Sequence, residues 1–343
     1  MSNYGVVHTG DVVYTKSPLK ANPYGIIKAN KGKPGIVSVL YGVYHTRENA
    51  NADFIQMYFE QDARLNNYLR PLVNKGAKNT LLISDTDALE GEVCLAPTFD
   101  EQKAIGQFFD SLDNLITLHQ RKYDKLQVLK KAMLEKMFPK NGSSVPEIRF
   151  KGFTDAWEQR KLGEVVKEVT RNDPTSEAPI MMITANNGFI EQSERYAFDN
   201  AGESLKKYIL LQKGELAYNH GASKLRPFGS CFALTTAESA RIPFVYHCFS
   251  AENKNAEFLS IELNGSEVES QLRKIVSSGA RMDGLLNISF DEYSTVTVLL
   301  PDIKEQEHIA DFFRNLDHLI TLHQRELEKL QNIKKSMLEK MFV

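Results

Sequence analysis

The loop YNHGASKLRPFG, residues 218–229, holds several side chains that can bind the edges of DNA bases. Amide side chains suit adenine, arginine suits guanine, and serine and lysine can reach bases or phosphates. The loop offers these groups between glycines: Asn219, His220, Ser223, Lys224 and Arg226. A plain surface loop needs no such mixture, so this segment is a candidate for base reading.

Two other loops carry groups of the same kind. SSGARMDG, residues 277–284, places Arg281 two residues after a glycine, as KGAK places Lys78 earlier in the chain. ITANNG, residues 183–188, contains Asn186 and Asn187, which suit either a turn or adenine. Arg281 and Lys224 are the stronger candidates, because a lysine recurs at Lys78 and Lys20.

A basic stretch lies near the start of the sequence. No acid occurs from Val12 to Arg47, whereas tyrosines alternate with the lysines Lys16, Lys20, Lys28, Lys31 and Lys33. Each phosphate that such residues neutralise releases counterions and steepens the salt dependence of binding. The stretch is consistent with DNA binding and equally with an ordinary solvated lysine-rich loop.

The motifs of common catalytic sites are missing from the sequence. It contains no GxxxxGK[ST] and no GxGxxG, so we expect no nucleotide or methyl-donor site in this chain. EQK at 101–103 becomes EQE at 305–307, so it indicates a helix start rather than a nuclease. We expect no catalytic residues, no cofactor and no metal ligands.

Composition indicates an intracellular protein with room for two domains. The 343 residues include 42 Lys and Arg against 44 Asp and Glu, so no global charge points to nucleic acid. Three cysteines without CxxC spacing suit a reducing compartment. No apolar run approaches the ~20 residues of a membrane span. We therefore expect a cytoplasmic chain with no membrane contact.

One long segment occurs twice, at 97–138 and at 301–342. Aligned at an offset of 204 without gaps, 26 of 42 positions are identical. Apolar residues recur at alternating spacings of three and four with charges between them, which predicts one long helix in each copy. About 38 residues at ~1.5 Å each would give a helix of roughly 57 Å.

We expect the two helices to pair as an antiparallel coiled coil. Both copies share the central string LITLHQR, which contains His119 and His323. In an antiparallel pair these histidines would meet near the crossing point and fix the register. The alternative is that both are hydrated surface groups. Two imidazoles without further ligands fall short of a zinc site.

The duplication extends to the regions before the helices. Tyr4, Gly10, Tyr14 and Gly25 match Tyr208, Gly214, Tyr218 and Gly229 at the same offset. The sequence predicts an α+β fold of two repeated units, with domains at 1–96 and 154–300, helices at 97–138 and 301–343, and a linker at 139–153. The counterpart of residues 146–204 would precede residue 1, so we expect an incomplete first domain.

The order of these motifs resembles a known family. IRFKGFTDAWEQRKLGEV precedes an α+β domain, then LPxxxEQxxI opens a helix that ends KKSMLEKMF, and the array is duplicated. This is similar to the specificity subunit of type I restriction-modification systems, which act against foreign DNA. The resemblance covers essentially the whole chain and departs from the family at the front.

The resemblance implies target-recognition domains that each read half of a bipartite site on double-stranded DNA. It also implies that the paired helices separate these domains and dock two methyltransferase subunits. S-adenosylmethionine, ATP and Mg²⁺ would then be used by the methyltransferase and motor-nuclease partners. A separate fragment or a second copy of the chain would complete the first domain. The alternative is a coiled-coil assembly or anti-restriction factor that binds the methyltransferase without reading DNA.

Overall fold

The structure is a computed structural model that describes residues 4–75, 81–140, 142–185, 188–194, 202–276 and 285–342. Four predicted DNA-binding residues, Lys78, Asn186, Asn187 and Arg281, lie outside these ranges. The chain divides into two compact units. Unit 1 contains residues 1–125 and 320–343, and unit 2 contains residues 126–319.

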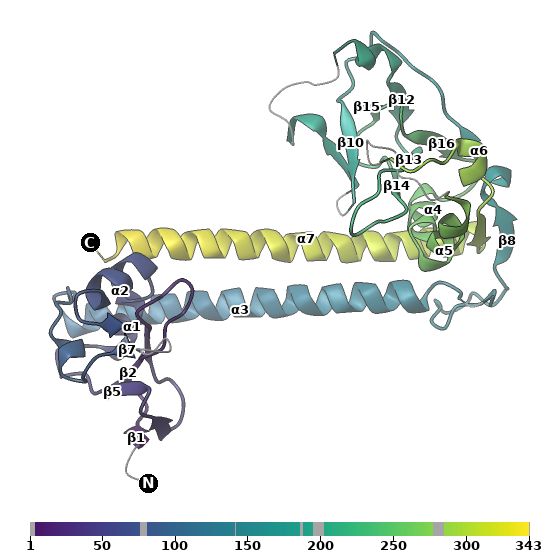
Figure 1. The fold of residues 1–343 in the computed structure, drawn as a ribbon. Helices are drawn as coiled ribbons and strands as arrows, with labels where there is room; N and C mark the ends of the chain where they lie inside the picture. The colour runs from purple at the N-terminus through teal and green to yellow at the C-terminus, as the bar shows by residue number, and fades with distance from the viewer. Residues whose placement is uncertain are drawn as a thin grey trace. The chain divides into compact units, whose positions relative to one another are not determined.

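Unit 1 begins with a small α+β domain (Figure 1). Its strands are β1 (Tyr4–Val7), β2 (Val12–Thr15), β3 (Ile26–Ala29), β4 (Gly35–Ser38), β5 (Tyr41–Tyr44), β6 (Asn74–Lys75) and β7 (Leu81–Leu82). Two helices, α1 (Ala52–Tyr58) and α2 (Asp62–Leu69), follow β5, and a 3-10 turn spans Asp87–Leu89. The strands form an antiparallel sheet β3-β2-β5 and the separate pairs β1-β4 and β6-β7.

The core of this domain lies between the three-stranded sheet and the helices. Tyr14 and Leu69 are almost fully buried there. A second apolar cluster joins α1 to the helix pair through Phe54, Met57, Phe109, Leu338 and Phe342. The domain is therefore packed on residues from both long helices.

Unit 2 contains a larger α+β domain. Its strands are β8 (Glu158–Lys161), β9 (Val166–Glu168), β10 (Met181–Thr184), β11 (Gly188–Glu191), β12 (Ile209–Gln212), β13 (Leu216–Asn219), β14 (Ser230–Ala233), β15 (Ser239–Ile242), β16 (His247–Ala251) and β17 (Thr297–Leu300). Its helices are α4 (Ala256–Leu263), α5 (Ser266–Ile275) and α6 (Phe290–Tyr293), with 3-10 turns at Leu162–Glu164, Gln192–Glu194 and Gly202–Lys207.

The central sheet of unit 2 has the order β14-β13-β16-β9 and a core on each face. One core includes Trp157, Phe258 and Tyr293 and extends to both long helices. The other includes Met181 and Ile183 of β10 and residues of the pair β12-β15. Two cores around one sheet give this domain a three-layered build.

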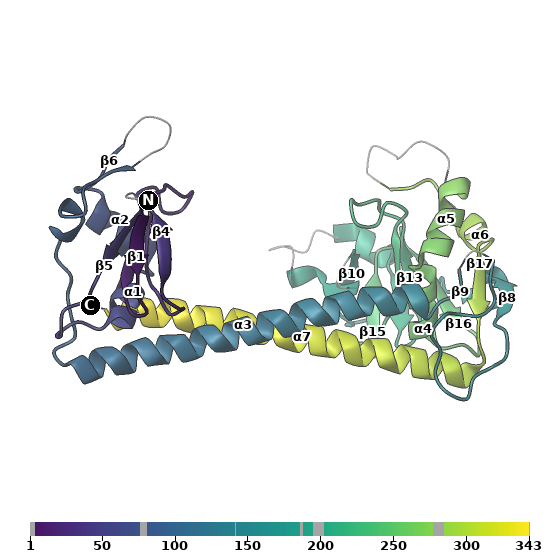
Figure 2. The same cartoon turned by 90° about the horizontal axis from the view of Figure 1, so that it is seen from below.

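The two long helices, α3 (Phe99–Lys136) and α7 (Ile303–Lys340), have 38 residues each and match at the offset of 204. They lie side by side in both views (Figures 1 and 2). In unit 1, Asp113 pairs with Lys334 at 2.7 Å and His119 contacts His323, so the helices run antiparallel. The predicted fold class, two α+β units each followed by a long helix of a coiled pair, is confirmed.

The repeats share individual hydrogen bonds as well as elements. Gln102 and Gln306, in the first turns of α3 and α7, accept bonds from the backbone N–H of Asn51 at 2.9 Å and Asn255 at 3.0 Å. Both asparagines cap the helix that follows them. Each long helix is thus joined to the domain before it by the same amide contact.

Candidate nucleic-acid interface

The predicted base-reading loop, 218–229, connects β13 to β14. A tight turn forms its tip, because Ser223 N–H donates to the Arg226 carbonyl at 3.0 Å and Arg226 N–H donates to Ser223 Oγ at 3.0 Å. Ser223 and Lys224 are exposed on this turn. These two side chains are available to a ligand outside the domain.

Two other predicted residues of the loop have structural partners. The Asn219 side chain accepts from Gly221 N–H at 2.9 Å and donates to the Ile183 carbonyl at 3.2 Å. His220 is 7% exposed, and its ring nitrogens lie 2.8 Å and 2.6 Å from the carbonyls of Leu286 and Val245. Both side chains therefore join distant segments of the domain.

Arg226 is also used within the domain. Its Nη1 donates to the carbonyl of Asn264, the C-cap of α4, at 2.9 Å. Desolvation by burial lowers the pKa of its guanidinium. Arg226 thus holds the loop against α4, and Lys224 remains the exposed cation of the loop.

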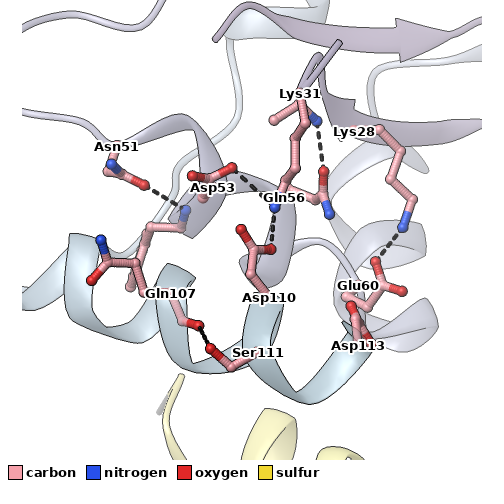
Figure 3. Close-up of polar contacts among 12 residues, drawn as sticks. Lys28, Lys31, Asn51, Asp53, Gln56, Glu60, Gln107, Asp110, Ser111 and Asp113 are labelled. Carbon is pink, nitrogen blue, oxygen red and sulfur yellow. Dashed lines mark hydrogen bonds and ion pairs between the residues drawn. The ribbon is translucent and has the colours of Figure 1, made fainter. Parts of the chain in front are cut away.

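The lysines of the basic stretch in unit 1 divide into two groups. Lys16 pairs with Asp85 at 2.6 Å, and Lys28 pairs with Glu60. Lys31 lies between Asp53 at 3.1 Å and Asp110 of α3 (Figure 3). Lys20 and Lys33 are exposed, and no ion pair involves either of them in the described ranges.

The ion pairs Lys31–Asp110 and Glu60–Lys334 join the first domain to the helix pair, and Lys28 pairs with the same Glu60. Burial opposes the charge of Lys31, but the bonds to Asp110 and Asp53 outweigh it and raise its pKa. Burial likewise favours neutral Glu60, but Lys28 and Lys334 outweigh it and lower its pKa. The acids that pair with Lys28 and Lys31 lie on α1, on the residues after it and on α3. The sequence did not suggest them as partners.

The central histidines face each other across the helix pair. His119 Nδ1 and His323 Nδ1 are 3.2 Å apart, with ring centroids 5.1 Å apart. Desolvation, with added repulsion from His119 and Lys122, lowers the pKa of His323. The contact suits a neutral pair in which one ring donates to the other.

No group of three or more histidine, cysteine, aspartate or glutamate side chains in the described ranges could hold a metal ion. Of the helices in those ranges, none is long and apolar enough to cross a membrane.

Sequence reasoning missed one buried ion pair. Arg149 contacts both carboxylate oxygens of Glu305 at 2.7 Å, and Glu305 is fully buried. From the sequence, Arg149 was expected only to lie in the linker at 139–153. The repeated EQ at 101–102 and 305–306 was the signal that could have indicated it. The start of a helix favours an acid but does not require the same acid and glutamine in both copies.

The geometry defines a duplicated α+β protein whose domains are joined to an antiparallel helix pair, and comparisons with known proteins agree with it. No family model matches the chain. The type I restriction enzyme MjaVIII specificity subunit of Methanocaldococcus jannaschii is 24% identical over 265 residues, which are 71% of this chain. The chain spans 59% of the length of that relative.

One solved structure shows the same fold at a TM-score above 0.5. The S subunit of a type I restriction-modification system from M. genitalium matches with a TM-score of 0.59 and 12% identity, over 98% of this chain and 84% of that one. The HsdS subunit from Thermoanaerobacter tengcongensis matches with a TM-score of 0.46 and 18% identity, over 98% of this chain and 81% of that one. The predicted resemblance to type I specificity subunits is confirmed.

Proposed function

We propose that this chain is the DNA-recognition subunit of a type I restriction-modification complex in the cytoplasm. The observation that carries the proposal is the duplicated unit, an α+β domain joined to a 38-residue helix, in a chain related in sequence to a specificity subunit. Under this proposal the chain catalyses no reaction. Its partners would supply the chemistry that uses S-adenosylmethionine, ATP and Mg²⁺.

The duplication supports a bipartite target. The two long helices have related sequences and run antiparallel, and a duplicated pair of this kind would suit two equal partners and two half-sites. The exposed surfaces of α3 and α7 would dock two methyltransferase subunits, and a motor-nuclease subunit would join that assembly. A fragment or a second copy would complete the first domain.

Within unit 2, Lys224 and Ser223 are the side chains through which loop 218–229 would contact DNA. They are exposed on a turn that is held by one backbone hydrogen bond and by the bond from Arg226 N–H to Ser223 Oγ, which supports this assignment. Asn219, His220 and Arg226 would position the loop. In unit 1, Lys20 and Lys33 are the exposed candidates for phosphate contacts, because Lys16, Lys28 and Lys31 are paired with acids.

Selection of binding sites from randomised duplex DNA tests the proposal. The chain would be mixed with its methyltransferase subunit at a fixed salt concentration, since salt sets the nonspecific background. We expect an enriched motif for the complex. Binding without any motif, with a steep salt dependence, would instead support the alternative of an assembly or anti-restriction factor.

A variant series identifies the reading loop. Lys224→Ala should weaken binding to the selected site by about 1–3 kcal/mol, or lower the salt slope by about one if Lys224 contacts a phosphate. Lys213→Ala is the matched control, because Lys213 is an exposed lysine of the same unit that pairs with Glu238 at 2.6 Å. Equal effects of the two variants would remove Lys224 from the interface.

A further inference from the structure

In unit 2, residues 146–185 cover one face and both edges of the strand pair β12-β15. Leu210 N–H donates to the Arg171 carbonyl at 2.7 Å, and Arg241 N–H donates to the Pro179 carbonyl at 2.9 Å. From the same segment, Met181 and Ile183 pack in the core that includes residues of β12 and β15. We call residues 146–185 the cover segment.

The cover segment also contacts two other parts of unit 2. Its β8 pairs with β17 from Thr297 to Leu300. Its Arg149 forms the bidentate pair with Glu305 in the first turn of α7, and Glu305 is fully buried. Three separate surfaces of unit 2 are thus closed by one continuous segment.

The counterparts of these three surfaces are open in unit 1. Val6 and Ile36 match Leu210 and Ala240 at the offset of 204; they are 57% and 73% exposed, whereas Leu210 is half-buried and Ala240 is fully buried. Residues 93–96, which match β17, form no strand. Glu101, which matches Glu305, is exposed, and no ion pair involves it among the described residues.

The open surfaces of unit 1 have the same features that the cover segment contacts in unit 2, namely apolar strands and a carboxylate at the start of a long helix. Exposed apolar strands with unpaired edges bind further strands, since a new strand satisfies the edge and removes apolar surface from water. The carboxylate of Glu101 corresponds to the partner of Arg149. We call β1, β4 and residues 93–101 the open face of unit 1.

We infer that the open face of unit 1 is a binding surface for a polypeptide segment related to residues 146–185. This inference rests on the proposed completion of the first domain and names its surface and its occupant. The segment would pair with residues 93–96, place an arginine against Glu101, and cover Val6 and Ile36. A second copy of the chain is a poorer occupant, because its own cover segment is already buried in unit 2, with Ile183 2% exposed.

A peptide with the sequence of residues 146–185, added to the full chain, tests the inference without DNA. Binding would be measured by fluorescence anisotropy of the labelled peptide, and located by amide hydrogen exchange. We expect new protection at residues 4–7, 35–38 and 93–96. In unit 2 the attached segment has a high effective concentration, so the free peptide should not replace it.

A charge exchange between the two molecules provides the decisive variant. Glu101→Arg should weaken peptide binding about tenfold or more, because it places two arginines together at a site designed for one ion pair. The peptide variant Arg149→Glu should restore binding to that chain. Asp100→Lys is the matched control, since its counterpart in α7 is already Lys304, and it should leave binding unchanged.

Three results would overturn the inference. The first is absence of peptide binding to the full chain. The second is protection confined to unit 2, which would show exchange with the attached segment. The third is self-association of the chain with protection of residues 4–7 and 35–38 in the absence of peptide, which would make the open face an interface between copies. None of these results depends on whether the chain reads a DNA sequence.

Discussion

Glu262 is a buried carboxyl group whose ionisation should weaken unit 2. It lies on α4, is 7% exposed, and accepts a bond from Leu299 N–H at 3.0 Å. Burial raises its pKa from 4.5 to about 7, and the backbone bond only partly opposes this shift. The folded state therefore holds the proton more tightly than the unfolded chain does.

This difference predicts a pH dependence for Glu262→Gln. A raised pKa gives a stabilisation that is complete below about 4.5 and is lost as the pH rises through about 7. Glutamine cannot ionise and can still accept from Leu299. Relative to the parent chain, the variant should gain about 1–3 kcal/mol in the free energy of unfolding between pH 5 and pH 8.

Denaturant titrations at the two pH values check this outcome. Variant and parent contain the same histidines, so any contribution of the histidines to the free energy of unfolding is absent from the difference between the two chains. Glu252→Gln is the control, because Glu252 is an exposed acid of the same unit. A difference between variant and parent that stays constant with pH would show that Glu262 is not protonated in the folded chain.

Residue types alone located the loop at 218–229 but not the direction of its side chains. Asn219, His220 and Arg226 turn inward because their partners lie 25 to 66 residues away in the chain. The residues next to these side chains in the sequence do not indicate such distant partners. Lys16, Lys28 and Lys31 show the same limit, since the acids that neutralise them come from outside the acid-free stretch.

At the scale of elements, the loop between β13 and β14 depends on a glycine with a left-handed conformation. Gly229 has φ of 80°, and a Cβ there would lie 2.5 Å from the Asn219 carbonyl oxygen and 2.8 Å from the Tyr218 ring. The Tyr218 hydroxyl donates to the Phe228 carbonyl at 2.7 Å. Gly25 and Tyr14 repeat this arrangement in unit 1. Close packing and backbone conformation both require glycine.

Gly229→Ala should therefore destabilise unit 2 more than Gly214→Ala. Gly214 has φ of 84° but open space around its Cβ position, so alanine there costs only the backbone term of about 1–2 kcal/mol. At Gly229 the collisions with the Asn219 carbonyl oxygen and the Tyr218 ring add to that term. Thermal unfolding of the two variants measures the difference, and equal losses would mean that the backbone at Asn219 and the ring both shift at no cost.

The helices were the best predicted elements, because their evidence is periodic and duplicated. A spacing of three and four residues fixes the buried face of α3 and α7, and the two related sequences begin and end their helices at matching positions. The short strands were predicted only as regions. Four-residue strands hold too few residues for a reliable period, and their pairing depends on segments far away in sequence.

At the scale of the whole molecule, the two repeats offer a matched comparison of stability. Strands β1 and β4 should exchange their amide hydrogens faster than β12 and β15, because the first pair is open and the second is covered. We expect the free energy of opening to be lower by at least about 2 kcal/mol in the open pair.

Native-state hydrogen exchange with mass spectrometry would compare these four strands in one sample. The sheets β3-β2-β5 and β14-β13-β16 serve as the internal reference, since β2 and β13 are enclosed by the same partners in both repeats. Equal protection of the two outer pairs would contradict the view that unit 1 lacks a cover. The duplicated sequence predicted that the first domain lacks the counterpart of residues 146–204. Which residues of the first domain are exposed as a result became known only from the fold.

Unit 1 is assembled from two distant stretches of chain, and this affects the order in which a ribosome can produce folded units. Residues 320–343 pack with residues 1–125, and Arg64 donates to the Phe342 carbonyl at 2.8 Å. Unit 2 is contiguous from 126 to 319. Unit 1 can therefore fold only after residues 320–343 have been synthesised, so residues 1–125 would remain a client for chaperones while unit 2 folds ahead of them.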